Sequence, residues 1–284
     1  DIFCSYCIIP YVRGKVISKK IDDILFEAEQ LISNGYKEIV LTGIHLGAYG
    51  KEVGYQVSII NVLEELQTLP GLERVRLSSI EVNEITDGLI DLIADSDKVC
   101  PHFHLPLQSG DDYILKRMNR KYNSAQYFKT LEKIKERLEL PSISTDVMVG
   151  FPGEEREHFE NTLRFCEQAG FSRTHIFPYS PREDTPAAKM PDHCKPSEIK
   201  ARKRELESLT AEISLRYKKL FTGKNISILV EGTRDKKTGK LCGYSDRYIK
   251  VLFDGTDDLM NEIVDVYVER ALPQFVMGKC LSRG

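Results

Sequence analysis

The sequence predicts a parallel α/β domain followed by a small antiparallel β-barrel. In roughly the first 180 residues, short apolar runs alternate with helical patterns, which is typical of βαβ units and a parallel sheet. After Pro191 the composition changes to a long charged segment and then to short runs of β-favouring residues separated by turns. We therefore expect a catalytic domain over residues 1–190, a helical connector over 191–221 and a β-barrel over 222–284.

The first part contains five expected strands and five expected helices. Apolar residues at helical spacing predict helices near residues 21–32, 57–69, 84–94, 123–138 and 155–169. The expected strands are residues 39–43, 74–80, 103–107, 144–149 and 174–177. Each strand ends in a polar or glycine-rich loop, and parallel α/β folds build their sites at the carboxyl ends of strands. The active site is expected among these loops.

The second part begins with a long helix, expected from Pro196 to about Phe221. Proline suits the first turn of a helix, and Gly223 supplies a stop signal. Three strands are expected after it, at residues 226–230, 248–253 and 263–268.

Composition and charge narrow the class of protein. Hydrophobic residues make up 41% of the 284 residues and charged residues 29%, which is ordinary for a globular protein. No apolar run is long enough to span a membrane and no signal peptide is recognisable, so we expect a cytoplasmic protein with no membrane partner. The net charge is −3, yet residues 195–250 carry 15 Lys and Arg against 7 Asp and Glu. This basic zone indicates either a polyanionic partner or a solvated helix face.

Cysteine usage gives the sharpest local signal. Cys4 and Cys7 form a C-x-x-C motif, which by itself is compatible with zinc, a redox dithiol or an iron–sulfur cluster. A structural zinc site needs a second close pair of ligands, and a thioredoxin-like motif fits poorly before Ile8-Ile9-Pro10. The other cysteines are expected to be structural, as small buried hydrophobes. These are Cys100, Cys166, Cys194, Cys242 and Cys280.

Residues 4–14, C-S-Y-C-I-I-P-Y-V-R-G, resemble the cluster loop of the radical S-adenosylmethionine (SAM) methylthiotransferase family. Further segments are similar to this family in the same order. They are residues 41–50, 76–81, 104–110, 115–120, 145–154 and 177–188. The resemblance implies a partial parallel (βα)6 barrel, a 4Fe-4S cluster and SAM, which the reduced cluster cleaves to a radical.

The family pattern has three cluster cysteines, C-x-x-x-C-x-x-C, and Cys4 and Cys7 match the last two. The first cysteine would fall immediately before Asp1, and the first barrel strand is likewise expected before it. The family also implies a preceding domain with a second cluster, which this sequence does not contain.

The same resemblance implies positions for SAM contacts at the strand ends. Thr42 and Gly43 are expected at the methionyl end, and Glu81, Gln108 and Asp146 near the ribose or substrate. Gly150 and Gly153 are expected to let backbone approach the adenine, flanked by Phe177 and Tyr179. Phe177 as ordinary core and Asp146 as a satisfied loop carboxylate are equally good interpretations. His45 is expected to fix its loop by hydrogen bonding rather than to ligate the cluster.

The last part resembles a TRAM domain, through C-G-Y-S-D-R-Y-I-K-V at residues 242–251. Basic and aromatic side chains there are suited to phosphate contact and base stacking. The expected RNA contacts are Arg234, Lys236, Lys237, Arg247, Tyr248 and Lys250.

Within the family, residues 42–47 and 78–81 resemble the branch that acts on threonylcarbamoyladenosine beside the anticodon of tRNA. The implied reaction adds a methylthio group at carbon 2 of the adenine. It requires tRNA, a low-potential electron donor and a sulfur donor. Three alternatives remain: a branch acting on isopentenyladenosine or on a ribosomal-protein aspartate, a non-catalytic RNA-binding protein, and a zinc-stabilised structural module.

Overall fold

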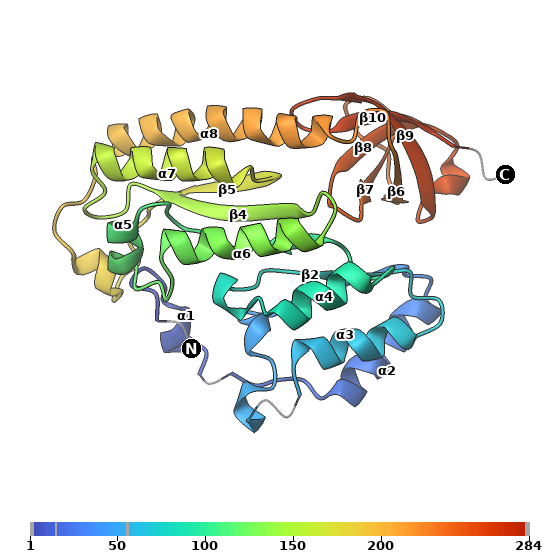
Figure 1. Cartoon of the computed structure of the whole chain (residues 1–284), viewed down its shortest axis with the longest axis horizontal. Helices are drawn as coiled ribbons and strands as arrows, with labels where there is room; N and C mark the ends of the chain where they lie inside the picture. Colours follow the sequence, from blue (N-terminus) through green and yellow to red (C-terminus); the bar gives the residue numbers. More distant parts are fainter. Residues whose placement is uncertain (1–2, 15, 55–56, 282–284) are drawn as a thin grey trace.

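A computed structural model describes residues 3–14, 16–54 and 57–281. Figure 1 shows a sheet covered by helices, a long helix running along it, and a β-barrel at the far end of that helix. The arrangement agrees with the parallel α/β domain and the small β-barrel that the sequence predicts.

Five parallel strands form the sheet in chain order. They are β1 (Glu38–Leu41), β2 (Arg74–Leu77), β3 (His102–His104), β4 (Ser142–Val149) and β5 (Arg173–Pro178). β1 pairs with β2, and β3, β4 and β5 pair in sequence. Parallel bridges from Val75 to Val99 and from Ser79 to His104 join the two groups. The sheet is thus the partial parallel barrel expected from the sequence.

Helices cover one face of the sheet, and this is where the main core lies. Ile39, Val75, Phe103, Ile143 and Val147 point into it from the five-strand sheet. The covering helices are α2 (Ile21–Ser33), α3 (Ile59–Thr68), α4 (Asp87–Asp95), α6 (Ser124–Arg137) and α7 (Arg156–Ala169). Successive strand side chains alternate between faces, so the opposite, concave face takes the intervening polar residues.

Two short helices were not expected from the sequence. α1 (Ile9–Val12) follows the C-x-x-C turn, and α5 (Asp112–Arg117) follows β3. The side chain of Asp111 caps α5 by accepting from the backbone N–H of Ile114. Both helices are too short to show an apolar period, which explains why the sequence pattern does not reveal them.

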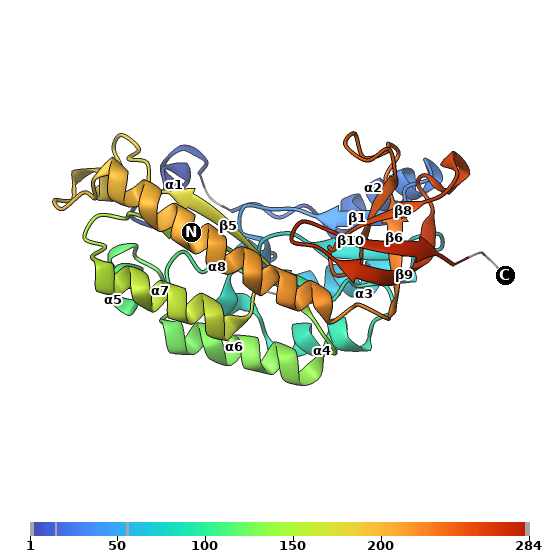
Figure 2. The same ribbon diagram turned by 90° about the horizontal axis from the view of Figure 1, so that it is seen from above.

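Helix α8 (Pro196–Lys219) connects the sheet to the barrel. In Figure 2 it lies alongside α7 and β5, and its last turn reaches the barrel. A buried ion pair anchors its first half: Arg202 Nη1 lies 2.7 Å from Glu154 Oε1. Ser214 donates to the carbonyl of Ser172 and so ties the second half to the start of β5.

The barrel is closed by five strands in the order β10-β8-β7-β6-β9. They are β6 (Asn225–Val230), β7 (Leu241–Ser245), β8 (Lys250–Asp254), β9 (Ile263–Ala271) and β10 (Val276–Cys280). Four of the pairs are antiparallel, but β10 and β8 pair in parallel. The barrel is therefore not purely antiparallel, and β7 and β10 are strands that the sequence pattern did not reveal.

The barrel is fixed to the amino-terminal ends of the sheet strands by arginines. Arg76 donates to the carbonyls of Asp246 (2.7 Å) and Ser245 (3.0 Å) and pairs with Glu38. Arg74 reaches Ser227 in the barrel, and Arg247 returns from the barrel to the carbonyl of Leu140. Within the described residues, no helix is long and apolar enough to cross a membrane.

Candidate functional site

Cys4 and Cys7 lie on one tight turn at the edge of a cavity. The backbone N–H of Cys7 donates to the carbonyl of Cys4 at 3.1 Å, which closes the turn. Ser5 fixes this turn to the body of the domain. Its backbone N–H donates to the carbonyl of Met118, and its hydroxyl donates to the carbonyl of Arg117. Cys4 is buried and Cys7 partly exposed, and neither forms a disulfide.

Arg120 contacts Cys4 directly. Its guanidinium donates to Cys4 Sγ at 3.3 Å and also contacts the carboxylate of Glu81. Burial opposes its charge, but Tyr122 and Glu81 raise the pKa of Arg120 above its ordinary value. Arg120 is therefore positively charged and is placed to compensate the negative charge of a thiolate ligand.

Glu81 and Tyr6 complete the immediate surroundings of Cys4. Burial raises the pKa of the Glu81 carboxyl, with Arg120 acting in the opposite direction. Burial also raises the pKa of Tyr6, so its hydroxyl keeps its proton beside Cys4. The ring of Tyr6 packs edge-on against Phe151, with centroids 6.3 Å apart.

The cavity has a volume of about 760 Å³ and brings together five residues predicted from the sequence. They are Cys4, Cys7, Thr42, Gly43 and Glu81. Thr42 and Gly43 follow β1 directly, and Glu81 comes shortly after β2, so all are at carboxyl ends of strands. Two thiols on one turn, with a cation and hydroxyl and backbone groups facing the same space, fit a cluster-bound cofactor.

His45 lies on the loop that follows β1, next to Glu84. Its Nε2 lies 2.5 Å from a carboxylate oxygen of Glu84, and both side chains are largely buried. Gly47 is required beside this pair, because a Cβ there would lie 2.3 Å from Glu84 Oε2. His45 Nε2 nevertheless makes no hydrogen bond within the described residues, so the role of His45 in fixing the loop stays a prediction.

Gln108, Asp146 and Phe177 do not line the cysteine cavity. Asp146 Oδ2 lies 3.3 Å from His104 Nε2 on the concave face. Phe177 is half exposed on β5. Gln108 has a left-handed backbone (φ 67°) and hydrogen-bonds through its backbone to Asp146 and Met148. Their roles as cofactor or substrate contacts stay predictions.

Gly150, Gly153 and Tyr179 lie in a different environment from Thr42 and Gly43. Gly150 and Tyr179 line a separate depression of about 520 Å³ beside α8. A Cβ on Gly150 would lie 2.4 Å from Ile199 Cγ1, and one on Gly153 would lie 2.9 Å from Arg117 Nε. The left-handed backbone at both positions (φ +78° and +82°), together with the overlap with Ile199 at Gly150, is enough to explain these glycines, and their role near an adenine stays a prediction.

The remaining cysteines are separate from the cavity. Burial raises the pKa of the Cys100 thiol to about 12 and that of Cys166 to about 12. Cys194 donates to the carbonyls of Phe151 and Glu154. Cys242 is buried in the barrel. In the described part of the chain, no group of three or more His, Cys, Asp or Glu is arranged to hold a metal ion.

The predicted RNA contacts fall into two groups. Arg247, Tyr248 and Lys250 face the sheet across a second cavity. Arg234 pairs with Asp257 and donates to the carbonyls of Gly239 and Gly255, so it stabilises its own turn. Lys236 and Lys237 are exposed on that turn. These residues stay predicted RNA contacts.

Two residues of the site were not predicted from the sequence, namely Arg120 and Tyr6. Arg120 lies in one of the segments that resemble the family, at residues 115–120, but nothing in that segment indicates contact with Cys4. Arg120 and Cys4 are 116 positions apart in the chain, so only the fold brings them together.

Comparison with known proteins agrees with both parts of the fold. Residues 1–166 match the model of the radical SAM superfamily, and residues 219–281 match that of the TRAM domain. The structure resembles a radical SAM methyltransferase, TsrM, from Kitasatospora setae. The TM-score is 0.53 at 16% identity, over 65% of this chain and 36% of that one.

Two curated relatives align with almost the whole chain. "Threonylcarbamoyladenosine tRNA methylthiotransferase MtaB" of Bacillus subtilis is 39% identical over 95% of this chain and 60% of its own length. "tRNA-2-methylthio-N(6)-dimethylallyladenosine synthase" of Alkaliphilus oremlandii is 39% identical over 94% of this chain and 56% of its own length. The chain thus spans less than two thirds of the length of these relatives. From the match over more than half of its residues, we conclude that the chain belongs to the radical SAM superfamily and carries a TRAM domain after it.

Proposed function

We propose that this chain is the catalytic and RNA-binding part of a tRNA methylthiotransferase. Its substrate is threonylcarbamoyladenosine beside the anticodon, and it is modified at carbon 2 of the adenine. The alignment of almost the whole chain with relatives named for methylthiolation of tRNA adenosines carries the reaction class. The choice of branch rests on the resemblance of residues 42–47 and 78–81 to the threonylcarbamoyladenosine branch.

In this proposal residues 1–190 are the catalytic domain, residues 191–221 the connector and residues 222–284 the RNA-binding barrel. Cys4 and Cys7 hold the cluster, which when bound and reduced supplies the electron that cleaves SAM. Thr42, Gly43 and Glu81 bind the cofactor, because they share the cavity with the two cysteines.

The residues around the cluster position have separate tasks. Arg120 holds Cys4 Sγ and keeps its own charge, while its contact with Glu81 fixes the guanidinium in place. Tyr6 packs against Phe151 beside Cys4, which is buried. An anticodon-loop base is unpaired, so presenting it to an open concave face costs less than flipping a base from a duplex. A low-potential electron donor and a sulfur donor complete the reaction.

A second candidate is the dimethylallyladenosine branch. The relative from Alkaliphilus oremlandii carries that name and is as similar to this chain as the threonylcarbamoyladenosine enzyme. Both candidates predict the same cluster and cofactor residues, so only the nucleoside product separates them.

The test is mass spectrometry of tRNA nucleosides from cells that lack the gene. We expect loss of 2-methylthio-threonylcarbamoyladenosine and accumulation of its unmodified precursor. Reintroducing the gene restores the product, whereas a gene with Cys7→Ala does not. Cys280→Ala, in the barrel, is the matched control and restores it. If dimethylallyladenosine derivatives change instead, the second candidate is correct. If no tRNA nucleoside changes, the proposal is wrong.

A further inference from the structure

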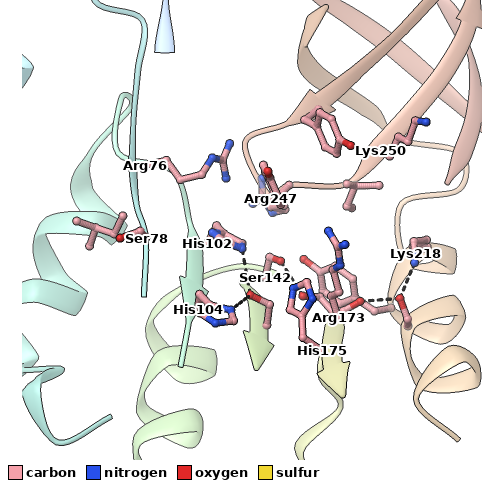
Figure 3. A pocket seen from close by; sticks show the side chains of 18 of the residues that line it. Arg76, Ser78, His102, His104, Ser142, Arg173, His175, Lys218, Arg247 and Lys250 are labelled. Atoms are coloured by element: carbon pink, nitrogen blue, oxygen red, sulfur yellow. Dashed lines mark hydrogen bonds between the residues drawn. The ribbon is translucent and has the colours of Figure 1, made fainter. Parts of the chain in front are cut away.

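A second cavity, of about 630 Å³, lies between the concave face of the sheet and the barrel. Figure 3 shows its labelled side chains converging from three sides. Arg76, His102 and Arg173 come from the sheet strands β2, β3 and β5. Lys218 comes from the last turn of α8, and Lys250 from the barrel strand β8. The cavity is therefore at the amino-terminal ends of β3, β4 and β5, away from the cysteine turn.

The lining of this cavity is strongly cationic. Five of its side chains are Lys or Arg, and none of the described lining residues is Asp or Glu. Three of the five cations are paired with carboxylates that lie outside the lining. Arg76 pairs with Glu38, Arg247 with Asp246 and Lys250 with Asp235.

Arg173 and Lys218 are the two cations that lack a carboxylate partner within the described residues. Lys218 Nζ donates to the hydroxyl of Ser214 and to the carbonyl of Pro273 at 2.9 Å, and both acceptors are neutral. The backbone of Arg173 belongs to the β4–β5 ladder, but its exposed side chain has no hydrogen bond or ion pair to any described residue, and it is labelled in the close-up of the cavity. Lys218 is partly buried and Arg173 is exposed; two like charges that line one cavity repel each other, and an anion between them removes that repulsion.

The pKa values of two neighbouring groups are lowered in part by the positive charge of Arg173. Burial, and after it the charge of Arg173, lowers the pKa of Lys218 to about 8. Burial and Arg173 also lower the pKa of His175. The charge of Arg173 thus acts on groups from both α8 and β5.

His102 adds a polar atom that has no partner. Its side chain is buried at 6% exposure, and its Nδ1 lacks a hydrogen bond within the described protein. Burial lowers the pKa of His102 to about 3, so the ring is neutral. Its Nε2 lies 3.3 Å from Ser144 Oγ, which in turn contacts His104 Nδ1 at 2.9 Å. A buried nitrogen without a partner is costly and indicates a ligand or a water in the cavity.

We propose that Arg173 and Lys218 form a phosphate-binding site in this cavity and that a backbone phosphate of the substrate RNA occupies it. The choice of RNA rests on the proposed function, and the geometry favours a chain over a small ligand. Val40 lines both this cavity and the cysteine cavity, so the two adjoin on the concave face. Thr42 follows Val40 by two residues, about 7 Å along the strand. An RNA strand with one base near the cysteines can therefore continue along the concave face toward this site.

The experiment measures binding of a fluorescent tRNA transcript to the full chain by anisotropy, over a range of salt concentrations. The site variant is R173A/K218A. The control is R216A/K219A, which removes the same charge from exposed positions of α8 that do not line the cavity; Arg216 pairs there with Glu167. We expect the site variant to bind about tenfold more weakly or worse, because each charge-assisted hydrogen bond contributes about that factor. The slope of log affinity against log salt should become shallower by about 1.

Conservative substitution and a free ligand complete the test. R173K/K218R keeps both charges and should retain most of the affinity and the salt slope. If the site and control variants bind tRNA equally, the phosphate site is refuted while the proposed function stands. If wild type binds no tRNA, both are refuted. If AMP, titrated by calorimetry, binds wild type but not R173A/K218A while tRNA affinity is unchanged, the site takes a free phosphate and RNA is the wrong occupant.

Discussion

Gly150→Ala tests whether this glycine is required by packing rather than by a cofactor. Gly150 has a left-handed backbone, with φ at +78°, which costs an alanine about 1–2 kcal/mol. The new Cβ would also lie 2.4 Å from Ile199 Cγ1 and 2.8 Å from Ile199 Cδ1. Relieving such an overlap in a packed region costs about 1–3 kcal/mol more. We expect a total loss of about 2–5 kcal/mol in the free energy of unfolding.

Gly170→Ala is the matched control in the same domain. Gly170 ends α7 with φ at +66°, and the nearest atom to an added Cβ is Lys135 Nζ at 4.0 Å. This variant therefore measures the backbone cost without the overlap. The difference between the two variants should be about 1–3 kcal/mol.

The assay is urea unfolding followed by circular dichroism, with Ile199→Ala and the double variant G150A/I199A measured alongside. Because truncating Ile199 opens the space that the new Cβ needs, the double variant should lose less stability than the two single losses added together. Equal losses for Gly150→Ala and Gly170→Ala, with simple additivity in the cycle, would refute the packing argument. An unchanged stability together with weakened SAM binding would instead favour the role near the adenine.

Two further predictions concern buried and desolvated charges. Glu154→Ala should lower the free energy of unfolding, measured in urea, by about 3–5 kcal/mol, because it leaves Arg202 buried without its partner. E154L/R202M, which removes both charges, should lose less stability. An equal loss in the two variants would contradict this reasoning. For Lys218, whose pKa is lowered to about 8 by burial and Arg173, tRNA affinity should fall as the pH rises from 7 to 9, because the free lysine loses its proton. Its other contacts, Ser214 and the carbonyl of Pro273, do not titrate. In Lys218→Arg, whose arginine keeps its charge, tRNA affinity should change less between pH 7 and pH 9. An identical pH profile for the wild type and this variant would contradict the prediction.

Much of the fold could be predicted from the sequence because its signals are local. All five sheet strands and five of the helices that cover or connect them appear where apolar periodicity places them. Two barrel strands were not predicted, because they lack such a local signal. β7 (L-C-G-Y-S) and β10 (V-M-G-K-C) contain a glycine and polar residues, so neither shows an apolar run. In both, a Cβ on the glycine would overlap the neighbouring strand, which explains the glycine but only in the folded barrel.

The candidate site also has one part that the sequence predicts and another that only the fold reveals. The sequence by itself determines the turn of Cys4 and Cys7 and the loops that end β1 and β2, because these are short contiguous motifs. Only the tertiary structure places Arg120 on Cys4 Sγ, since the two are 116 residues apart. It also decides which basic residues are available for a ligand. Nothing in the sequence indicates a partner for Arg247, but in the fold its guanidinium donates to the carbonyl of Leu140 between the barrel and the sheet domain. Arg173 and Lys218 also have no distinguishing sequence signal, and in the fold they lack a carboxylate partner within the described residues. The charge of each side chain is known from the sequence. Whether an opposite charge neutralises it depends on which distant groups the fold brings within a few ångströms.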